Sequence, residues 1–162
     1  MRKILLSVTF LLLAGLAGMA QAQTTGYDRH QGYYYPAPQT VETYVARVKE
    51  LPEAERRRRI AFVIGVTGQA MRSPFPPQYA IFAKGDQAEK LIIVGLDDGR
   101  FNTIYRMRAL LAMLTSMART TPVFRDTAVS DELTFLDMLK MMGFKRLTVT
   151  DGATISHQIN IK

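Results

Sequence analysis

Few side chains in this sequence are suited to acid–base chemistry. Histidine occurs twice, as His30 and His157, and an imidazole titrates close enough to neutral pH to accept or donate a proton. Asp97 and Asp98 are adjacent carboxylates that follow an apolar run, and paired carboxylates can serve as acid and base when their surroundings separate their pKa values. The candidate catalytic residues are therefore His157, Asp97 and Asp98.

Each candidate also has a structural interpretation. In a strand, His157 points the same way as Ile155 and Ile159, which predicts a core position on an apolar face. Asp97 and Asp98 precede Gly99, and aspartate is common in turns because its side chain bonds the backbone. The sequence contains no cysteine and no G-x-S-x-G turn, two common settings for a catalytic nucleophile. The pattern favours a non-catalytic protein and leaves catalysis open.

Metal-binding spacing is also missing from the sequence. There is no H-x-x-x-H pair and no cluster of carboxylates. Met138 and Met141 could place two thioether sulfurs on one helix face, a ligand set that suits copper(I). Methionine at helical spacing more commonly fills a core. We therefore expect neither a metal nor a cofactor.

Two segments have the composition of contact surfaces, the tyrosines at 33–35 and the arginines at 56–59. Successive helix residues turn by about 100°, so the four arginines cannot share one solvent face. The run is either a solvated helix end with salt bridges or a contact for an acidic protein, an anionic lipid or a phosphorylated ligand. Nucleic acid is not expected, because aromatic residues are not interleaved with these arginines. The expected partner-binding residues are Tyr33, Tyr34, Tyr35, Arg56, Arg57, Arg58 and Arg59.

The N-terminus has the pattern of a secretory signal peptide. Arg2 and Lys3 precede an apolar run over residues 4–16, and Ala20-Gln21-Ala22 offers a cleavage site. The run is too short for a transmembrane helix, which needs about 20 apolar residues. We expect residues 1–22 to be removed and the rest of the chain to be periplasmic or secreted. Removal of the two basic leader residues lowers the net charge from +7 to +5, which favours mild attraction to anionic surfaces.

Two parts follow the leader. Residues 23–39 lack apolar periodicity and end in Pro-Ala-Pro, which predicts an extended Tyr/Pro-rich arm. This arm is either a spacer against its own domain or a docking segment for a partner. Residues 40–162 are long enough for one domain with its own core.

The expected elements of this domain alternate between helices and strands. Apolar spacing predicts a helix over 40–51, a second from Pro52 to about residue 72, a third from a cap at Asn102 or Thr103 to about 118, and a fourth capped by Ser130. Segments 79–83 and 91–96 predict one pair of strands, and the segments around Leu147 and Ile159 predict another, joined by a turn at Asp151-Gly152. The second expected helix is almost wholly apolar over 60–66, so we expect it to be buried on most sides.

This order predicts an α+β fold. We expect a two-layer sandwich in the order ααββααββ, with a mainly antiparallel four-stranded sheet and the helices on one face.

Several stretches resemble a family of small exported proteins from alphaproteobacteria. They are Tyr33-Tyr34-Tyr35-Pro36, residues 76–85, residues 89–96, residues 109–114 and residues 121–126. Some members of that family carry the label molybdopterin-guanine dinucleotide biosynthesis protein A, and the resemblance implies such a role as an alternative function. Enzymes with that activity open with a Leu-Ala-Gly-Gly loop, and the nearest match here, residues 13–19, lies inside the expected leader. From the residues themselves we expect a non-catalytic periplasmic binding or accessory protein.

Overall fold

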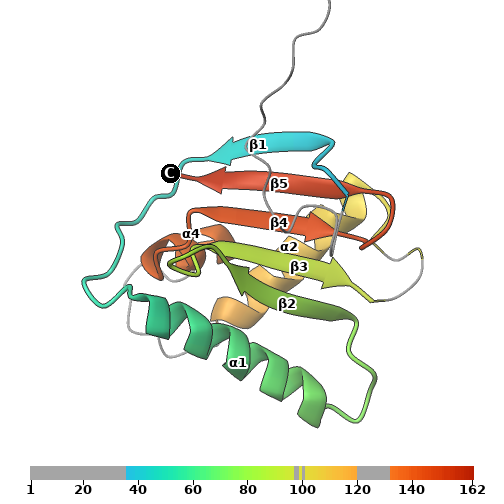
Figure 1. Ribbon diagram of the computed structural model, residues 1–162, viewed down its shortest axis with the longest axis horizontal. Helices are drawn as coiled ribbons and strands as arrows, with labels where there is room; N and C mark the ends of the chain where they lie inside the picture. Colours follow the sequence, from blue (N-terminus) through green and yellow to red (C-terminus); the bar gives the residue numbers. More distant parts are fainter. Residues whose placement is uncertain (1–35, 97–98, 100, 120–131) are drawn as a thin grey trace, which may run out of the picture.

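The chain folds into a five-stranded sheet with three helices in the part that the computed structural model describes, residues 36–96, 99, 101–119 and 132–162 (Figure 1). The elements are β1 (Thr40–Tyr44), α1 (Arg56–Arg72), β2 (Tyr79–Lys84), β3 (Lys90–Gly95), α2 (Ile104–Arg119), α4 (Phe135–Met141), β4 (Arg146–Thr150) and β5 (Ser156–Ile161). The expected α+β class is confirmed. The expected four strands, the mainly antiparallel sheet and the order ααββααββ are wrong.

The sheet is mixed and has the strand order β1-β5-β4-β3-β2. Strands β2 and β3 form one antiparallel pair and β4 and β5 form another, as the turn signals predict. Strand β3 pairs in parallel with β4, which joins the two hairpins, and β1 pairs in parallel with β5. These two parallel junctions are what makes the sheet mixed.

Strand β1 replaces the first half of the helix that we expected over residues 40–51. Its register with β5 runs from Thr40 opposite His157 to Tyr44 opposite Ile161. Three of its five residues, Thr40, Val41 and Thr43, are β-branched and suit a strand. Their spacing also fits a helix, and the edge of β5 decides between the two because it offers backbone partners to a strand.

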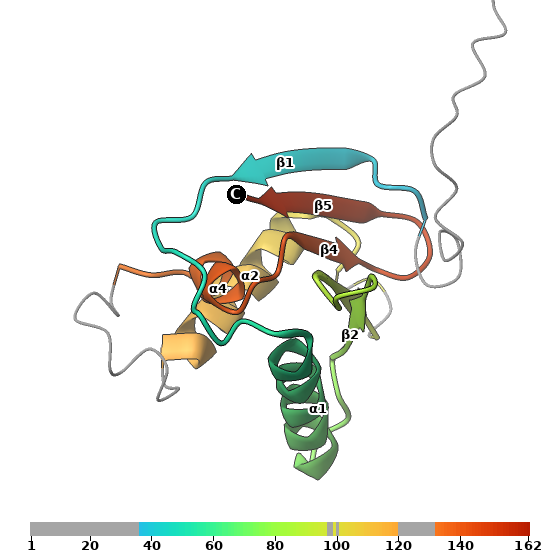
Figure 2. The same ribbon diagram turned by 60° about the vertical axis from the view of Figure 1, so that its left-hand side comes forward.

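The core lies between one face of the sheet and the helices. Leu91, Ile93, Leu147 and Val149 face the helices from the central strands and are completely buried. Helices α2 and α4 pack over these strands, and α1 lies at the margin beside β2 (Figure 2). The helices therefore cover a single face, and α1 covers the least of it.

The helix ends follow local capping chemistry. Helix α1 begins at Arg56 and not at Pro52, with Glu55 in extended backbone before it, and it ends at Arg72 as expected. Thr103 caps α2 by accepting a hydrogen bond from the Arg106 backbone N–H. Ser130 lies outside the described residues, and the cap of α4 is Thr134.

No described helix is both long enough and apolar enough to cross a membrane.

Candidate functional site

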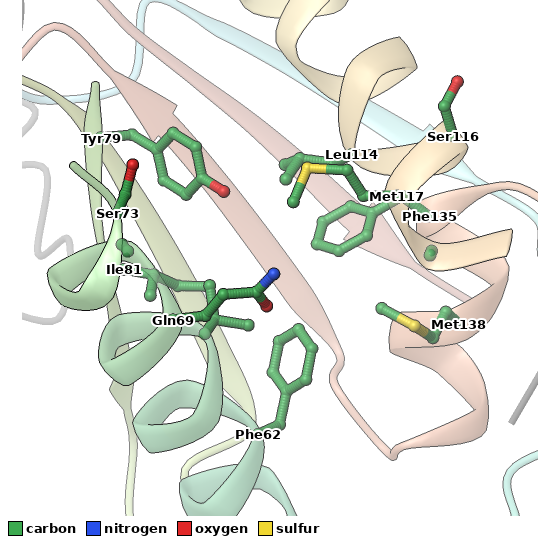
Figure 3. Close-up of a pocket in the computed structure, with 13 residues that line it drawn as sticks. Phe62, Gln69, Ser73, Tyr79, Ile81, Leu114, Ser116, Met117, Phe135 and Met138 are labelled. Carbon is green, nitrogen blue, oxygen red and sulfur yellow. The ribbon is translucent and has the colours of Figure 1, made fainter. Parts of the chain in front are cut away.

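An apolar groove of about 640 Å³ lies between α1 and the pair α2–α4, with β2 as its floor (Figure 3). Its lining residues are Phe62, Val66, Gln69, Ala70, Ser73, Tyr79, Ile81, Leu114, Ser116, Met117, Ala118, Phe135 and Met138. Volumes of about 300–1,000 Å³ with mainly apolar linings are typical of small-molecule sites. The groove is thus large enough and apolar enough to hold a small ligand.

The first wall of the groove is α1, which packs Phe62 and Val66 against the hydrophobic core and is tied down at its first turn by Arg59. This is the only buried residue of α1. Its guanidinium donates hydrogen bonds to the backbone carbonyls of Gln87 (2.9 Å), Ala54 (2.8 Å) and Met142 (3.2 Å). These bonds tie the first turn of α1 to the β2–β3 hairpin and to the end of α4. The rest of α1 packs less closely, and Phe62 and Val66 remain half-buried above the groove.

Gly143 makes room for this attachment. A Cβ atom at Gly143 would lie 2.4 Å from an Arg59 guanidinium nitrogen, and its φ of 79° is left-handed. Glycine adopts that conformation at no steric cost. Gly143, just after the C-terminal end of α4, therefore accommodates Arg59.

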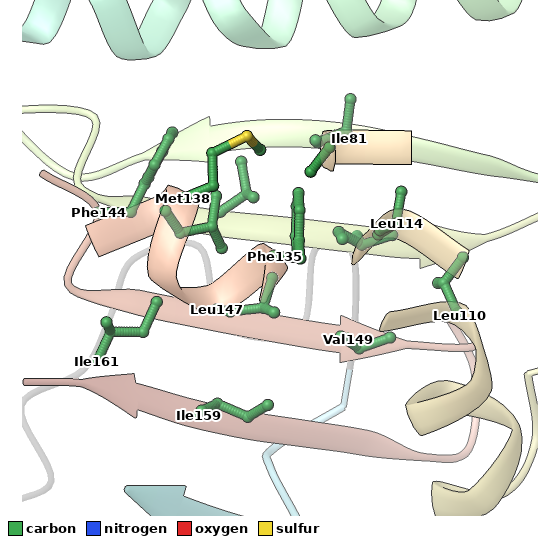
Figure 4. Close-up of a cluster of buried hydrophobic side chains, with 14 of the residues drawn as sticks. Ile81, Leu110, Leu114, Phe135, Met138, Phe144, Leu147, Val149, Ile159 and Ile161 are labelled. Carbon is green, nitrogen blue, oxygen red and sulfur yellow. The ribbon is translucent and has the colours of Figure 1, made fainter. Parts of the chain in front are cut away.

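The second wall is the α2–α4 pair, which is well packed. Leu114 of α2 and Phe135 and Met138 of α4 line the groove and also belong to the hydrophobic core (Figure 4). The Phe135 backbone N–H donates to the Thr115 hydroxyl at 3.0 Å, which fixes the start of α4 against α2. One wall is therefore fixed and the other is held at one end.

Two polar groups face the groove from the α1 and β2 side, Gln69 and the hydroxyl of Tyr79 (Figure 3). Neither side chain forms a hydrogen bond with another described residue. Burial raises the pKa of Tyr79, so its hydroxyl stays protonated at neutral pH and can donate a hydrogen bond as well as accept one. Tyr79 is the only titratable residue among the described lining residues, and this set suits binding better than acid–base chemistry.

The catalytic candidate His157 lies elsewhere in the fold. It is 1 % exposed and faces the helices from β5, as strand alternation predicts. The Thr40 hydroxyl lies 2.6 Å from its Nδ1 atom, and the Glu42 carboxylate lies 3.6 Å from its Nε2 atom. Glu42 also pairs with Arg108 of α2. Strands β4 and β3 separate β5 from the floor of the groove, so this cluster is a second polar site and not part of the first.

Burial lowers the pKa of His157 below its ordinary value. The nearby Glu42 carboxylate opposes this effect, whereas the Arg108 guanidinium adds to it. The histidine is therefore neutral at pH 7, and the hydroxyl, imidazole and carboxylate of Thr40, His157 and Glu42 lie in series.

The four arginines separate in the structure as the helix period requires. Arg56 and Arg57 are exposed, Arg58 pairs with Glu53 at 3.5 Å, and Arg59 is inside the fold. A partner contact through this run therefore concerns Arg56, Arg57 and Arg58. The remaining site predictions, Tyr33, Tyr34, Tyr35, Asp97 and Asp98, lie outside the described residues.

Among the residues that the structure describes, no group of three or more histidine, aspartate or glutamate side chains is arranged to hold a metal ion. Met138 and Met141 are both buried in the core.

The groove was not predicted from the sequence. Its lining residues are apolar, and an apolar residue at helical or strand spacing looks the same whether it faces the core or a cavity. One signal was available in the sequence. Residues 60–66 are more apolar than is usual for a helix at the margin of a fold, where one side is exposed. Most of that segment is only partly buried in the structure, so the expectation of burial on most sides was wrong.

Searches against protein-family models, curated proteins and solved structures found no match to this chain.

Proposed function

We propose that this chain is an exported, non-catalytic binding protein that holds a small, mainly apolar ligand in the groove between α1 and the α2–α4 pair. The groove itself carries the proposal, because its volume and its lining match those of small-molecule sites. The secretory leader pattern supports a location outside the cytoplasm.

The lining indicates the class of ligand. Phe62, Phe135 and Met138 offer aromatic and thioether surfaces, which adapt to aliphatic or aromatic shapes. Gln69 and the Tyr79 hydroxyl offer neutral hydrogen bonds from the α1 and β2 side, whereas the hydroxyls of the lining residues Ser73 and Ser116 already bond the backbone. No charged side chain is among the lining residues that the structure describes. The ligand is therefore an uncharged or weakly polar molecule with one hydrogen-bonding end, such as a short acyl chain or an aromatic alcohol.

The direct test is to fill the groove and measure binding of a fluorescent apolar probe, N-phenyl-1-naphthylamine. Ala70→Phe places a ring in the groove, and we expect the affinity to fall at least about tenfold, because the ring occupies the space that the probe needs. Ala61→Phe is the matched control, because Ala61 lies on the exposed side of the same helix. Equal probe binding by both variants and the parent would remove the groove as the site.

Native mass spectrometry of the protein purified from its exporting host adds an independent observation. A bound mass that the parent retains and Ala70→Phe loses identifies the natural ligand. The same sample gives the mass of the mature N-terminus, which we expect to begin at Gln23.

The alternative is an enzyme, and one arrangement favours it. Thr40, His157 and Glu42 lie in series, and a base that is itself oriented by a third group can activate a hydroxyl as a nucleophile. The family label implies a guanylyltransferase, so GTP turnover with Mg²⁺ is the assay. Loss of turnover in His157→Gln with unchanged folding would assign catalysis to this histidine, whereas loss of folding would assign it to the core.

A further inference from the structure

Helix α1 carries apolar side chains on the side that faces away from the groove. Ile64 is 65 % exposed, Met71 is 78 % exposed, and Phe75, just after the helix, is 75 % exposed. Ala61, Ile64 and Met71 follow one another at spacings of three and seven, so they lie along one side of the helix, and Phe75 follows the C-terminal end of the helix. We call this set, Ala61, Ile64, Met71 and Phe75, the exposed ridge. A surface helix normally presents polar residues in this position.

None of the other described segments covers the exposed ridge. A Cβ atom built on the neighbouring Gly65 would meet no atom within 4 Å. Helix α1 stands at the margin of the molecule, and its C-terminal end points away from the sheet (Figure 2). The ridge is therefore convex and accessible.

The charge of α1 is entirely positive. The helix contains five arginines and no aspartate, glutamate or lysine. Glu53 and Glu55, which precede it, offset part of this charge, and Glu53 pairs with Arg58. Arg56, Arg57 and Arg72 form no ion pair with another described residue. A guanidinium nitrogen of Arg72 lies 3.5 Å from the position of a Cβ atom on Gly68, beside the ridge.

We propose that α1 lies on an anionic lipid surface, with the exposed ridge at the boundary between headgroups and acyl chains. Arg57 and Arg72 lie near the two ends of the ridge, where their guanidinium groups can bind lipid phosphates. An apolar line with flanking arginines and no acidic residue is the pattern of a helix that binds in the plane of a membrane.

The shape of the surface favours a lipid over a folded partner. A convex surface with three large side chains offers no hollow for a peptide or for a protruding side chain of a partner protein. A lipid surface, in contrast, deforms around such side chains. The 17 residues of α1 span about 26 Å, and the helix is too polar at both ends to cross a bilayer. The groove lies on the opposite side of α1, so this proposal does not depend on the proposed ligand site.

The test is co-sedimentation with vesicles. The chain beginning at Gln23 is used because it contains every described residue and lacks the apolar run 4–16, which would itself bind lipid. One set of vesicles contains phosphatidylglycerol and phosphatidylcholine in equal amounts, and the other contains phosphatidylcholine alone. We expect adsorption to the first set, weakened by salt because charge screening reduces the attraction.

Two double substitutions distinguish binding through the exposed ridge from nonspecific adsorption. Met71→Ser/Phe75→Ser should bind the anionic vesicles at least about tenfold more weakly, because two apolar side chains no longer enter the lipid boundary. Arg57→Gln/Arg72→Gln should lose about fivefold per arginine. Val41→Ser/Val45→Ser is the matched control, because both valines are exposed on or beside β1, far from α1. Far-ultraviolet circular dichroism checks that each variant is folded.

Three outcomes would overturn the proposal. They are no adsorption of the parent, equal adsorption to both sets of vesicles, and adsorption that the ridge variants retain. Capture of α1 by an acidic protein without adsorption to vesicles would assign the ridge to a protein partner instead.

Discussion

Asp137 accepts hydrogen bonds from three separate parts of the chain, at Tyr44, Arg47 and Thr134. Its carboxylate accepts hydrogen bonds from the Tyr44 hydroxyl (2.8 Å), the Arg47 backbone N–H (2.9 Å) and the Thr134 backbone N–H (2.9 Å). Burial by itself raises the pKa of Asp137, but these bonds outweigh burial and hold it below its ordinary value. One buried carboxylate thus fixes the end of β1, the segment after it and the cap of α4.

Asp137→Asn should lower the free energy of unfolding by about 1–3 kcal/mol, because an amide accepts fewer of these hydrogen bonds and its NH₂ group faces donors. Urea denaturation measures the change. Glu132→Gln, an exposed change on the same segment, should alter the stability by less than about 0.5 kcal/mol. Equal effects of the two substitutions would contradict the role given to Asp137.

His157 should make the fold sensitive to mild acid. Its pKa in the folded protein lies below the ordinary value of 6.5, so the unfolded chain binds a proton more readily than the folded one. The contribution of His157 to the free energy of unfolding is therefore fully present above pH 6.5, and it decreases as the pH drops below that value.

The His157→Gln variant isolates this effect, because glutamine does not titrate. Urea denaturation between about pH 5 and pH 7.5 should show a slope for the parent and a flatter line for the variant. Asp137 and Asp151 have pKa values below 3.8, so they do not contribute in this range. Equal slopes of the free energy of unfolding against pH for the parent and the variant would mean that His157 does not change its protonation between the folded and unfolded states.

At the scale of elements, α1 is held by its first turn and leans over the groove. Arg59 supplies three hydrogen bonds to carbonyls from three segments. Gly143 leaves the space that these bonds need. Arg59 therefore anchors the first turn of the wall, and Phe62, Val63 and Val66 pack the next turns against the core.

Arg59→Met should lower the free energy of unfolding by about 2–4 kcal/mol, because it leaves three carbonyl groups without their donor. The same variant should also weaken binding of the naphthylamine probe, because the wall of the groove loses its anchor. Arg57→Met, two residues away and exposed, should change neither quantity. Normal probe binding by a destabilised Arg59→Met would mean that the groove does not depend on this attachment.

The elements that the sequence predicts correctly are those whose signals are local. The hairpins β2–β3 and β4–β5 have turn residues between apolar runs, and α2 has a long apolar period with a threonine cap. Strand β1 was missed because the apolar spacing of its five residues fits a helix as well as a strand. Its partner β5 also lies far away in the sequence. The groove was missed because Phe135 and Leu114 would be apolar whether they faced a cavity or a neighbour.

At the scale of the whole molecule, the C-terminus completes the sheet. Ile161 is buried in the core, and its backbone N–H donates to the Lys145 carbonyl. The backbone of Lys162 donates to the Tyr44 carbonyl and accepts from the Ala46 N–H, both at 2.9 Å. The last two residues thus hold the end of β1 in place.

A chain that ends at Asn160 should lose about 3–5 kcal/mol of stability, because it lacks a buried isoleucine and the backbone bonds to β1. Hydrogen exchange should show faster exchange in residues 40–46 than in the parent. Lys162→Ala keeps the backbone bonds and is the control, with stability close to the parent. Unchanged protection of β1 in the shortened chain would contradict this account of the sheet.

The parallel pairing of β1 with β5 has a consequence for the order of events during biosynthesis. Thr40 and His157, which meet in this pairing, are 117 positions apart, so β1 leaves the ribosome long before the edge of β5 that it joins. Contacts of such long range form slowly, because the loop must close before any of them contributes. Strand β1 therefore stays without its sheet partner until β5 has been synthesised, which makes this pairing one of the last steps in completing the sheet.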